Sequence, residues 1–350
     1  MSITPSPEVD APAHGLIAGG NFIVDTVIRI DHFPRQDMLA NIIDEAPTNG
    51  GGPYNVLRDL NALEAPFPLS AIGLVGTDER GRWITENCEA HGISAAQLHT
   101  TKDAPTSHTH VMTAVDTGRR TFFHHRGANS LLAPDHFDFT ASSAKLFYLG
   151  YLMLLDGLDD LDDSGRTGAS YVLEAAKAAG LTTIVDLVSV VHEGFRARVT
   201  ASFPWIDHLV LNEVEAGRLV GYELDGEDYA ALETAAQAIL AMGVGAEVVL
   251  HSAKGGVVAS HTDGVHAQDA LIVAPENFRG SNGAGDAFAA GYIYGLHEDW
   301  PIARRLQLAV SAAAVSLTDP SPSAGLLPCD ETLAATQHYA CSAWAPAETT

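Results

Sequence analysis

Small residues and one carboxylate stand together in the segment Phe278–Gly291, which has the sequence FRGSNGAGDAFAAG. Gly283, Ala284 and Gly285 directly precede a predicted helix, so the backbone there can approach a ligand closely. The first N–H groups of a helix lack intrahelical partners, and together with the helix dipole they can bind an anion such as a phosphate. Asp286 falls in that first turn. A carboxylate beside a phosphate can accept the proton of an attacking hydroxyl; the alternative is an ordinary acidic residue at a helix start.

Two further glycine runs precede predicted elements. The segment Asn49–Leu63, NGGGPYNVLRDLNAL, places Asn55 in the first turn of a helix, and Gly19–Asp25, GGNFIVD, places Asp25 beyond a strand. Each pattern alone is common. The chain contains no G-x-x-x-x-G-K-[ST] phosphate loop and no convincing G-x-G-x-x-G after a strand. The sequence therefore disfavours a P-loop nucleoside triphosphatase and a standard dinucleotide-dependent enzyme.

The elements that must position these residues alternate between strands and helices in the second half of the chain. Short apolar runs predict strands, and longer Ala-rich or periodic stretches predict helices. Such alternation is typical of βαβ units around a parallel sheet. We expect strands at 145–149, 182–187, 208–211, 247–251, 256–261 and 265–273, and helices at 168–179, 195–202, 213–220, 229–242, 283–295 and 302–317.

The first part of the chain is richer in β patterns. The tripeptide Asp116-Thr117-Gly118, between two alternating segments, is a strong hairpin signal. Strands are also expected within 15–30 and at 69–75, and helices at 54–63 and 81–91. We see no internal repeat and no low-complexity linker. The sequence therefore predicts one main α/β domain over 15–335 with a small antiparallel sheet attached, and loose tails at 1–14 and 343–350.

Composition narrows the range of partners. The chain has 350 residues, with 19 Lys+Arg against 44 Asp+Glu and a net charge of −25. Such a charge repels nucleic acid and anionic membranes, so neither is expected as a partner. Three widely spaced cysteines, no CxxC and no long apolar stretch favour a cytoplasmic protein. Lysine is scarce, and a salt-adapted source accounts best for the acidity.

The three glycine windows, taken in order, resemble the ribokinase-like (pfkB) carbohydrate kinases. The resemblance runs from about Gly15 to Pro328 and includes GLVGTDERG at 73–81 and LNEVEA at 211–216. It implies a three-layer α/β/α fold with a mostly parallel sheet and a small β-sheet lid. It also implies an enzyme that uses ATP to phosphorylate a hydroxymethyl group of a small sugar, as ribokinases, fructokinases and ketodeoxy-sugar kinases do.

The resemblance assigns roles at the C-terminal glycines. Asp286 matches the general base of the family, and the N–H groups of Gly283, Ala284 and Gly285 match its oxyanion position. This agrees with the chemistry expected from the residues alone, in which positioning and charge stabilisation dominate.

The family's Asn-x-x-Glu motif is matched by Asn212 and Glu215. The resemblance implies that the Glu organises Mg²⁺ through water and that the Asn lies near the nucleotide phosphates. Mg²⁺ keeps several of its waters, so one carboxylate suffices. The alternative for Glu215 is a solvated acidic residue on a helix.

Other matched positions concern the two substrates. The residues that match the sugar-hydroxyl ligands are Asp25, Gly51, Gly52 and Asn55. Those that match a loop near the nucleotide are Ser252, Lys254 and Gly255, and Lys254 is either a phosphate contact or a surface lysine.

One departure from the family pattern affects the cations. The usual Asp-Thr before the glycine turn is replaced by Gly280-Ser281, which argues against activation by K⁺. The candidate monovalent-cation residues near the matching loops are Asn282, Ser316, Asp319 and Ser321. The pair Asn282-Gly283 also resembles adenosine-kinase-type members, so a nucleoside kinase is an alternative, as is a non-catalytic relative that binds sugar or nucleotide.

The lid is expected from about 21–49 and 106–126, and its closure would exclude water from the sugar. Lids of such kinases often pair edge to edge, so a homodimer through the lid is expected. Four lid histidines, His108, His110, His124 and His125, form either a metal cluster or an ordinary strand surface. Three arginines, Arg119, Arg120 and Arg126, either bind a phosphate on the substrate or, for the first two, simply finish a hairpin turn.

Overall fold

A nine-stranded sheet, sheet A, forms the centre of the molecule in the computed structural model, which describes residues 13–140 and 142–345. Its strands, in spatial order, are β13 (Gly264–Asp269), β12 (Gly255–Ser260), β11 (Glu247–Ser252), β10 (His208–Asn212), β9 (Thr182–Leu187), β8 (Leu146–Leu152), β1 (Leu16–Gly20), β4 (Leu69–Gly76) and β5 (Ile93–Thr101).

The strands from β11 to β5 run parallel, and β12 and β13 add an antiparallel edge. Central strands such as β9 and β10 are apolar along most of their length because helices cover both faces of the sheet. The predicted mostly parallel α/β fold is confirmed. The sequence does not predict β5, whose segment ISAAQLHTT alternates weakly between buried and exposed positions.

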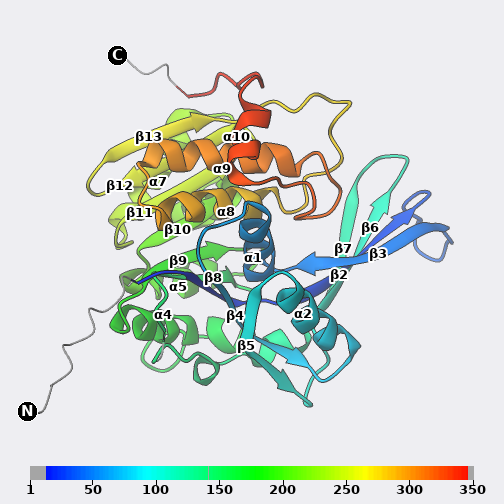
Figure 1. The fold of residues 1–350 in the computed structure, drawn as a ribbon, viewed down its shortest axis with the longest axis horizontal. Coiled ribbons are helices and arrows are strands. Elements are labelled where there is room, and N and C mark those ends of the chain that lie inside the picture. Colours follow the sequence, from blue (N-terminus) through cyan, green and yellow to red (C-terminus); the bar gives the residue numbers. More distant parts are fainter. Residues whose placement is uncertain (1–12, 141, 346–350) are drawn as a thin grey trace, which may run out of the picture.

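Helices lie on both sides of sheet A, which makes three layers (Figure 1). One face is covered by α1 (Gly52–Ala62), α2 (Glu79–Ala90), α8 (Ala284–His297), α9 (Ile302–Ser316) and α10 (Cys329–Thr336). The other is covered by α4 (Gly168–Ala178), α5 (Phe195–Thr200), α6 (Glu213–Val220) and α7 (Tyr229–Ala241). Short helical turns at 127–131, 134–136, 156–159 (α3) and 203–205 complete the fold.

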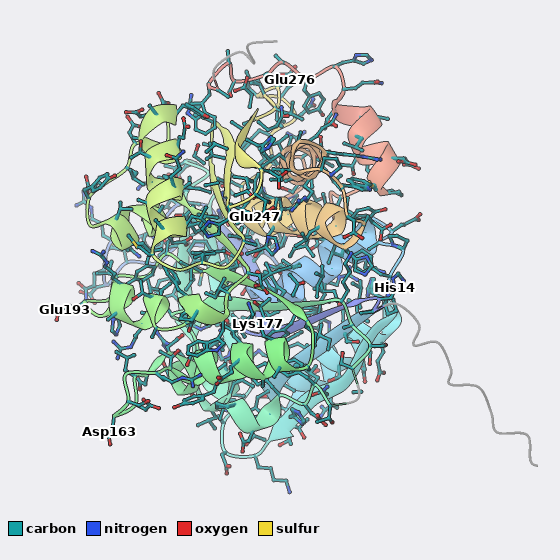
Figure 2. All side chains as sticks on the ribbon, turned by 90° about the vertical axis from the view of Figure 1, so that its left-hand side faces the viewer. His14, Asp163, Lys177, Glu193, Glu247 and Glu276 are labelled. Carbon is teal, nitrogen blue, oxygen red and sulfur yellow. The ribbon has the colours of Figure 1, made fainter. Side chains whose placement is uncertain are left out.

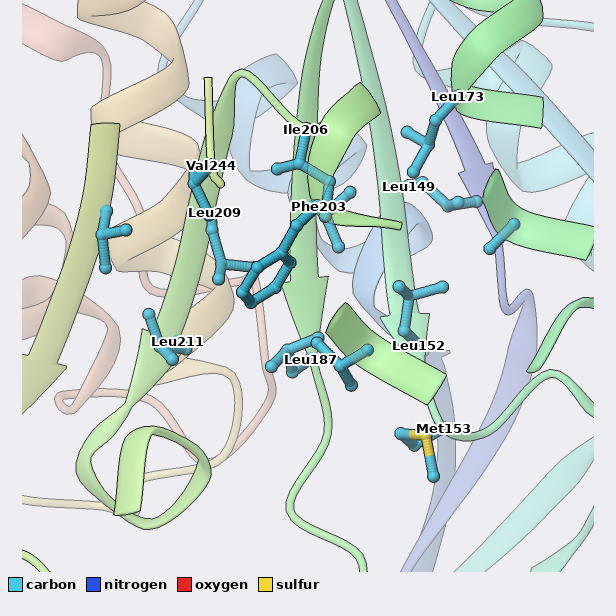
Figure 3. Packing of buried hydrophobic residues seen from close by; sticks show 14 of the residues in the cluster. Leu149, Leu152, Met153, Leu173, Leu187, Phe203, Ile206, Leu209, Leu211 and Val244 are labelled. Carbon is cyan, nitrogen blue, oxygen red and sulfur yellow. The ribbon is translucent and has the colours of Figure 1, made fainter. Parts of the chain in front are cut away.

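Each face of sheet A has its own apolar core. On the α4–α7 side, the ring of Phe203 packs among leucines of the sheet that include Leu187 and Leu209 (Figure 3). These three side chains are 2 % exposed or less. Burying an aromatic or Leu side chain contributes on the order of 2 kcal/mol each, so this packing fixes the strand ends that carry the polar residues described below.

Most of the acidic side chains point to solvent, and Glu247 is an exception. Figure 2 shows Asp163 and Glu193 at the surface and Glu247 inside the fold. The Glu247 carboxylate accepts hydrogen bonds from Arg305, 2.9 Å away, and from the buried Tyr292 hydroxyl. Burial raises the pKa of Glu247, but the His208 imidazole, 3.1 Å away, lowers it most, and together with Tyr292 and Arg305 it holds that pKa at about 2.

A separate four-stranded sheet, sheet B, projects from one side of the main body (Figure 1). Its order is β3 (Ile42–Gly50), β2 (Ile23–Ile30), β6 (His108–Ala114) and β7 (Arg120–His125). The outer pairs are antiparallel and the central pair β2–β6 is parallel, so the sheet is mixed rather than wholly antiparallel. The register places Asp25, Thr109 and His124 side by side on one face.

The C-terminal segment is attached further than the sequence predicts. The backbone N–H groups of Trp344 and Ala345 both donate to the Asp269 carboxylate, and the Trp344 ring packs edge-on against Tyr229. Residues 343–345, which the sequence predicts to be part of a loose tail, are therefore held against β13 by these hydrogen bonds and by the half-buried Trp344 indole. Residues 1–12 and 346–350 of the predicted tails lie outside the described residues. Within the described residues, no helix combines the length and apolarity needed to cross a membrane.

Candidate active site

A cavity of about 650 Å³ lies where the carboxyl ends of the sheet A strands face sheet B. In open α/β sheets, ligands bind outside the carboxyl ends of the strands, where the connecting loops diverge. Residues at the carboxyl ends of successive strands reach this cavity, namely Tyr151 in β8, Asp186 in β9, Asn212 in β10 and His251 in β11. Sheet B contributes Asp25, Thr109, Arg120, Phe122 and His124.

Asp286 occupies the first turn of α8 and is buried at the floor of this cavity. One carboxylate oxygen accepts the Tyr151 hydroxyl at 2.6 Å, and the other accepts the Asn55 side-chain amide at 2.8 Å. Burial raises the pKa of Asp286 to about 6, and the two hydrogen bonds oppose that rise. The group can therefore exchange a proton near neutral pH, as a general base must.

The start of α8 requires glycine at position 283. Its φ of 78° is in the left-handed region, and a Cβ there would lie 2.8 Å from Pro322. Gly283 and Gly285 line the cavity, and Ala284 begins the helix beside them. The expected anion position and the expected base are thus brought together at one helix N-terminus.

The glycines before α1 shape the opposite wall. Gly51 has a φ of 89°, and a Cβ on Gly50 would lie 2.4 Å from the Asp25 carboxyl carbon. Gly52 packs under the Tyr151 ring, where a Cβ would come within 2.8 Å, and does not itself line the cavity. Positions 50 and 52 must therefore be glycine, because any side chain there would clash with Asp25 or Tyr151.

The amide of Asn55 is oriented from behind. Asn49 donates to the Asn55 side-chain oxygen at 2.7 Å and to the Ser323 hydroxyl at 3.0 Å. This leaves the Asn55 nitrogen directed at Asp286. The junction of β3 and α1 and the distant loop after α9 therefore set the position of one carboxylate.

Asp186 is the residue that sequence reasoning missed. It is buried, lines the cavity, and accepts the Tyr148 hydroxyl at 3.0 Å. Burial and the nearby Glu215 carboxylate raise its pKa well above the ordinary value. An aspartate near the end of an apolar strand, here in TTIVDL, is the signal that could have indicated it.

Asn212 and Glu215 form the start of α6. The Asn212 side chain caps the N–H groups of Val214 and Glu215, and a Glu215 oxygen accepts the Asn212 N–H at 2.9 Å. This is a capping box, so the Asn-x-x-Glu pattern has a structural purpose in addition to its place on the cavity wall. Burial raises the pKa of Glu215.

The matched residues of the β11–β12 loop lie away from the cavity. Lys254 pairs with Glu227 at 3.1 Å, and the Ser252 hydroxyl donates to the Gly226 carbonyl. Gly255 packs under the Trp344 ring. The neighbouring His251 lines the cavity instead, and burial lowers its pKa to about 4, which leaves it neutral at pH 7.

The four candidate monovalent-cation residues are not all brought to the cavity. Asn282 lines it, whereas Ser316, Asp319 and Ser321 do not. The Ser316 hydroxyl donates to a carbonyl one helical turn back, and Asp319 accepts the N–H of Ser321. The last three residues therefore use their polar groups for local backbone structure.

The lid histidines divide between the two faces of sheet B. His108 and His125 stack with ring centroids 5.0 Å apart on the face opposite the cavity, and His110 lies beside His108. His124 faces the cavity, and its Nδ1 contacts the Thr109 hydroxyl at 3.0 Å. Among the described residues, no group of three or more His, Cys, Asp or Glu has the geometry of a metal site.

The three arginines also separate. Arg119 is exposed at the hairpin turn, and Arg126 pairs with Asp156 at 2.5 Å. Arg120 lines the cavity and donates to the Ser281 hydroxyl at 2.8 Å, which connects sheet B to the loop before α8. Arg119 thus fits the hairpin-turn interpretation, whereas Arg120 lines the cavity, and its role as a phosphate contact stays a prediction.

Comparisons with known proteins agree with the kinase chemistry that this geometry allows. Residues 20–328 match the family model described as pfkB family carbohydrate kinase, so the chain belongs to that family. It is accordingly a kinase that transfers a phosphoryl group to a sugar hydroxyl, and the family resemblance expected from the sequence is confirmed.

Two related proteins that cover most of this chain are also sugar kinases. The chain is 26 % identical to an ATP-dependent ribose-1-phosphate kinase of Halopiger xanaduensis, over 86 % of this chain and 91 % of the relative. It is 23 % identical to a 5-dehydro-2-deoxygluconokinase of Geobacillus thermodenitrificans, over 83 % and 84 %.

Two ribokinase structures share the fold. The structure from Giardia lamblia has a TM-score of 0.76 at 19 % identity and covers 92 % of this chain and 99 % of its own. The structure from Arabidopsis thaliana, complexed with ribose and ATP, has a TM-score of 0.74 at 19 % identity and covers 94 % and 100 %. The expected ribokinase-like fold is confirmed.

The burial of Asp25 yields a prediction that is independent of catalysis. Burial raises the pKa of Asp25 to about 7, against a hydrogen bond from Thr109 that lowers it. An acid whose pKa is raised by folding destabilises the fold once pH exceeds its unfolded pKa, and the penalty grows until the folded pKa is passed. Asp25→Asn should therefore raise the free energy of unfolding at pH 8 by about 1–3 kcal/mol, with no gain near pH 4. Urea denaturation at both pH values measures this.

Asp44→Asn is the matched control, since Asp44 lies on β3 of the same sheet, half-exposed, and pairs with Arg29. Its effect should stay within about 0.5 kcal/mol at both pH values. Equal destabilisation of the Asp25 variant at pH 4 and pH 8 would contradict the prediction.

Proposed function

We propose that this kinase transfers the γ-phosphoryl group of ATP to a hydroxymethyl group of a small sugar, with Asp286 as general base. The observation that carries the proposal is a buried carboxylate of raised pKa at the N-terminus of α8, bordering a cavity between the two sheets. Among the described residues that line the cavity, no other carboxylate both lies in the first turn of a helix and follows a glycine with positive φ.

The reaction follows from this placement. The sugar hydroxyl oxygen attacks the γ-phosphorus, its proton passes to the Asp286 carboxylate, and the bond from the γ-phosphorus to the bridging oxygen of ADP breaks. The N–H groups at Gly283, Ala284 and Gly285 stabilise the charge on the transferring group. Tyr151 holds Asp286 in place during the transfer.

Sugar hydroxyls are bound between the two sheets. Asp25 accepts from hydroxyls, and Asn55 lies close enough to Asp286 to orient the reacting end of the sugar. Gly51, which lines the cavity, lets the backbone approach the sugar ring. Sheet B acts as the lid, and its closure excludes water that would otherwise compete as phosphoryl acceptor.

The residues of the nucleotide side fit a magnesium ion. Asp186 and Glu215 are both buried, and the Glu215 carboxylate raises the pKa of Asp186, so a divalent cation between them would relieve this unfavourable charge. Mg²⁺ prefers carboxylate oxygens and retained waters. When bound, it would neutralise charge on the nucleotide phosphates. In this proposal Asn212 lies beside the phosphates of the bound nucleotide. Lys254 would have to break its ion pair with Glu227 to contact them.

K⁺ is not part of this proposal. Ser316, Asp319 and Ser321 direct their polar groups to nearby backbone, which gives no support to a monovalent-cation site there.

Replacing the proposed base tests the assignment. Asp286→Asn keeps the size and both neighbours but cannot accept the proton, so kcat should fall by roughly 10³-fold while ATP still binds. A coupled assay of ADP release and a calorimetric ATP titration measure the two quantities. Asp330→Asn is the control, since Asp330 is an exposed acid in the first turn of α10 and should leave kcat unchanged. Near-normal turnover of the Asp286 variant would refute the proposal.

We also propose that two copies pair through sheet B. The sheet ends in the edge strands β3 and β7, and Ile42 and Ile43 on β3 are 58 % and 52 % exposed. Exposed apolar edges need a cover, and a second copy supplies one of matching shape.

The wild-type chain should therefore sediment as a dimer at micromolar concentration. The double variant Ile42→Asp, Ile43→Asp should sediment as a monomer because each charge would be buried in the interface. Val191→Asp, at an exposed site near α5, should remain dimeric. A monomeric wild type would exclude the pairing.

A further inference from the structure

Arg120 is a cation without an anionic partner in an acidic cavity. Among the described residues that line the cavity it is the one Lys or Arg, and its side chain donates to the neutral Ser281 hydroxyl. None of the described carboxylates forms an ion pair with it, in contrast to Arg126, which pairs with Asp156. Arg120 is therefore available to an anion that enters the cavity.

The partial burial of the Arg120 guanidinium favours the binding of an anion. Removal from water lowers the pKa of the Arg120 guanidinium, although arginine stays charged in proteins. A partly buried charge costs free energy unless it is paired. In a chain of net charge −25 that offers this guanidinium no carboxylate, a bound anion is the partner that compensates.

The γ-phosphate of ATP does not need Arg120. It has its own position at the N-terminus of α8, where Gly283 and Gly285 face the cavity. Arg120 belongs to the opposite sheet, on the strand whose alternate side chains Phe122 and His124 also face the cavity. The cavity thus offers two anion positions, one at the N-terminus of α8 and one at the Arg120 guanidinium, which reaches from sheet B to Ser281 in the loop before α8.

The second position adjoins the residues proposed to bind the sugar. His124 lies in register with Thr109 and Asp25, and its Nε2 is buried without a hydrogen-bond partner. A buried polar atom without a partner indicates a ligand group that completes it. A sugar hydroxyl at Nε2 would place the ring over Asp25, with one end directed at Arg120 and the other at Asp286.

We propose that the acceptor of this kinase carries a phosphate of its own and that Arg120 binds it. The inference rests on the proposed function and adds the substrate class. Arg120 holds the phosphate through two parallel N–H···O hydrogen bonds, the geometry at which guanidinium excels. A free hydroxyl of the sugar phosphate attacks the γ-phosphorus, its proton goes to Asp286, ADP leaves, and the product is a sugar bisphosphate.

Matched acceptors test this directly. We would compare kcat/KM for ribose against ribose 1-phosphate and for fructose against fructose 1-phosphate and fructose 6-phosphate, with adenosine as a further acceptor. The wild type should prefer at least one phosphorylated sugar by about a hundredfold over its parent sugar, the usual effect of a buried charge-assisted contact. Arg120→Gln should abolish that preference, mainly by raising KM for the phosphorylated acceptor.

Two further variants separate phosphate binding from other effects. Arg119→Gln changes the neighbouring, exposed arginine and should retain the wild-type preference. Ser281→Ala removes the contact between the sheets but leaves the guanidinium, so the preference should also survive. Arg120→Lys should recover only part of it, because lysine cannot bind a phosphate bidentately.

The opposing outcomes are distinct. A wild type that prefers ribose, fructose or adenosine overturns the inference but leaves the kinase assignment intact. Equal losses for both acceptors in Arg120→Gln, with a raised KM for ATP, also overturn it, since Arg120 would then serve the nucleotide. No turnover with any acceptor would contradict the proposed function itself.

Discussion

The hydrogen bonds to Asp286 are the interaction on which the site depends. A carboxylate buried at the floor of the cavity would stay protonated well above its ordinary pKa if nothing favoured its charge. Tyr151 and Asn55, from two different elements, donate to its two oxygens and hold its pKa near 6. The parallel sheet, the glycine-rich entry to α1 and the loop that carries Ser323 all serve to bring these donors into place.

Much of the fold could be predicted because strongly patterned segments dominate it. The strand 182–187 and the helix 213–220 coincide with β9 and α6, where apolar runs and a capping box leave little choice. The strand β5 and the helix α10 were missed, since their segments are short, polar or weakly periodic and depend on tertiary contacts. The attachment of residues 343–345 is not predictable for a related reason, because the Trp344 indole packs on Tyr229 and Gly255, which are distant in sequence.

The residues of the candidate site likewise include some that the sequence predicts and some that it does not. Residues within the glycine windows, Asp25, Asn55 and Asp286, meet at one cavity, in agreement with the shared site that the family resemblance implies. Asp186 and Tyr151 come from strand ends that no motif marks, and their neighbours are set by sheet order rather than by sequence spacing. In the sequence, Arg120 cannot be distinguished from its neighbour Arg119, since both stand at the predicted hairpin turn. The alternation of β7 and the position of Ser281 distinguish it.

The pH dependence of kcat/KM in Tyr151→Phe tests the central claim most directly. In the wild type, activity should fall as pH drops through about 6, where Asp286 takes up a proton. Loss of the Tyr151 hydrogen bond disfavours the charged form, so this limb should move to higher pH by about one unit. Tyr148→Phe, which removes a donor to Asp186 instead, should leave the limb in place. A limb unchanged in Tyr151→Phe would contradict the account.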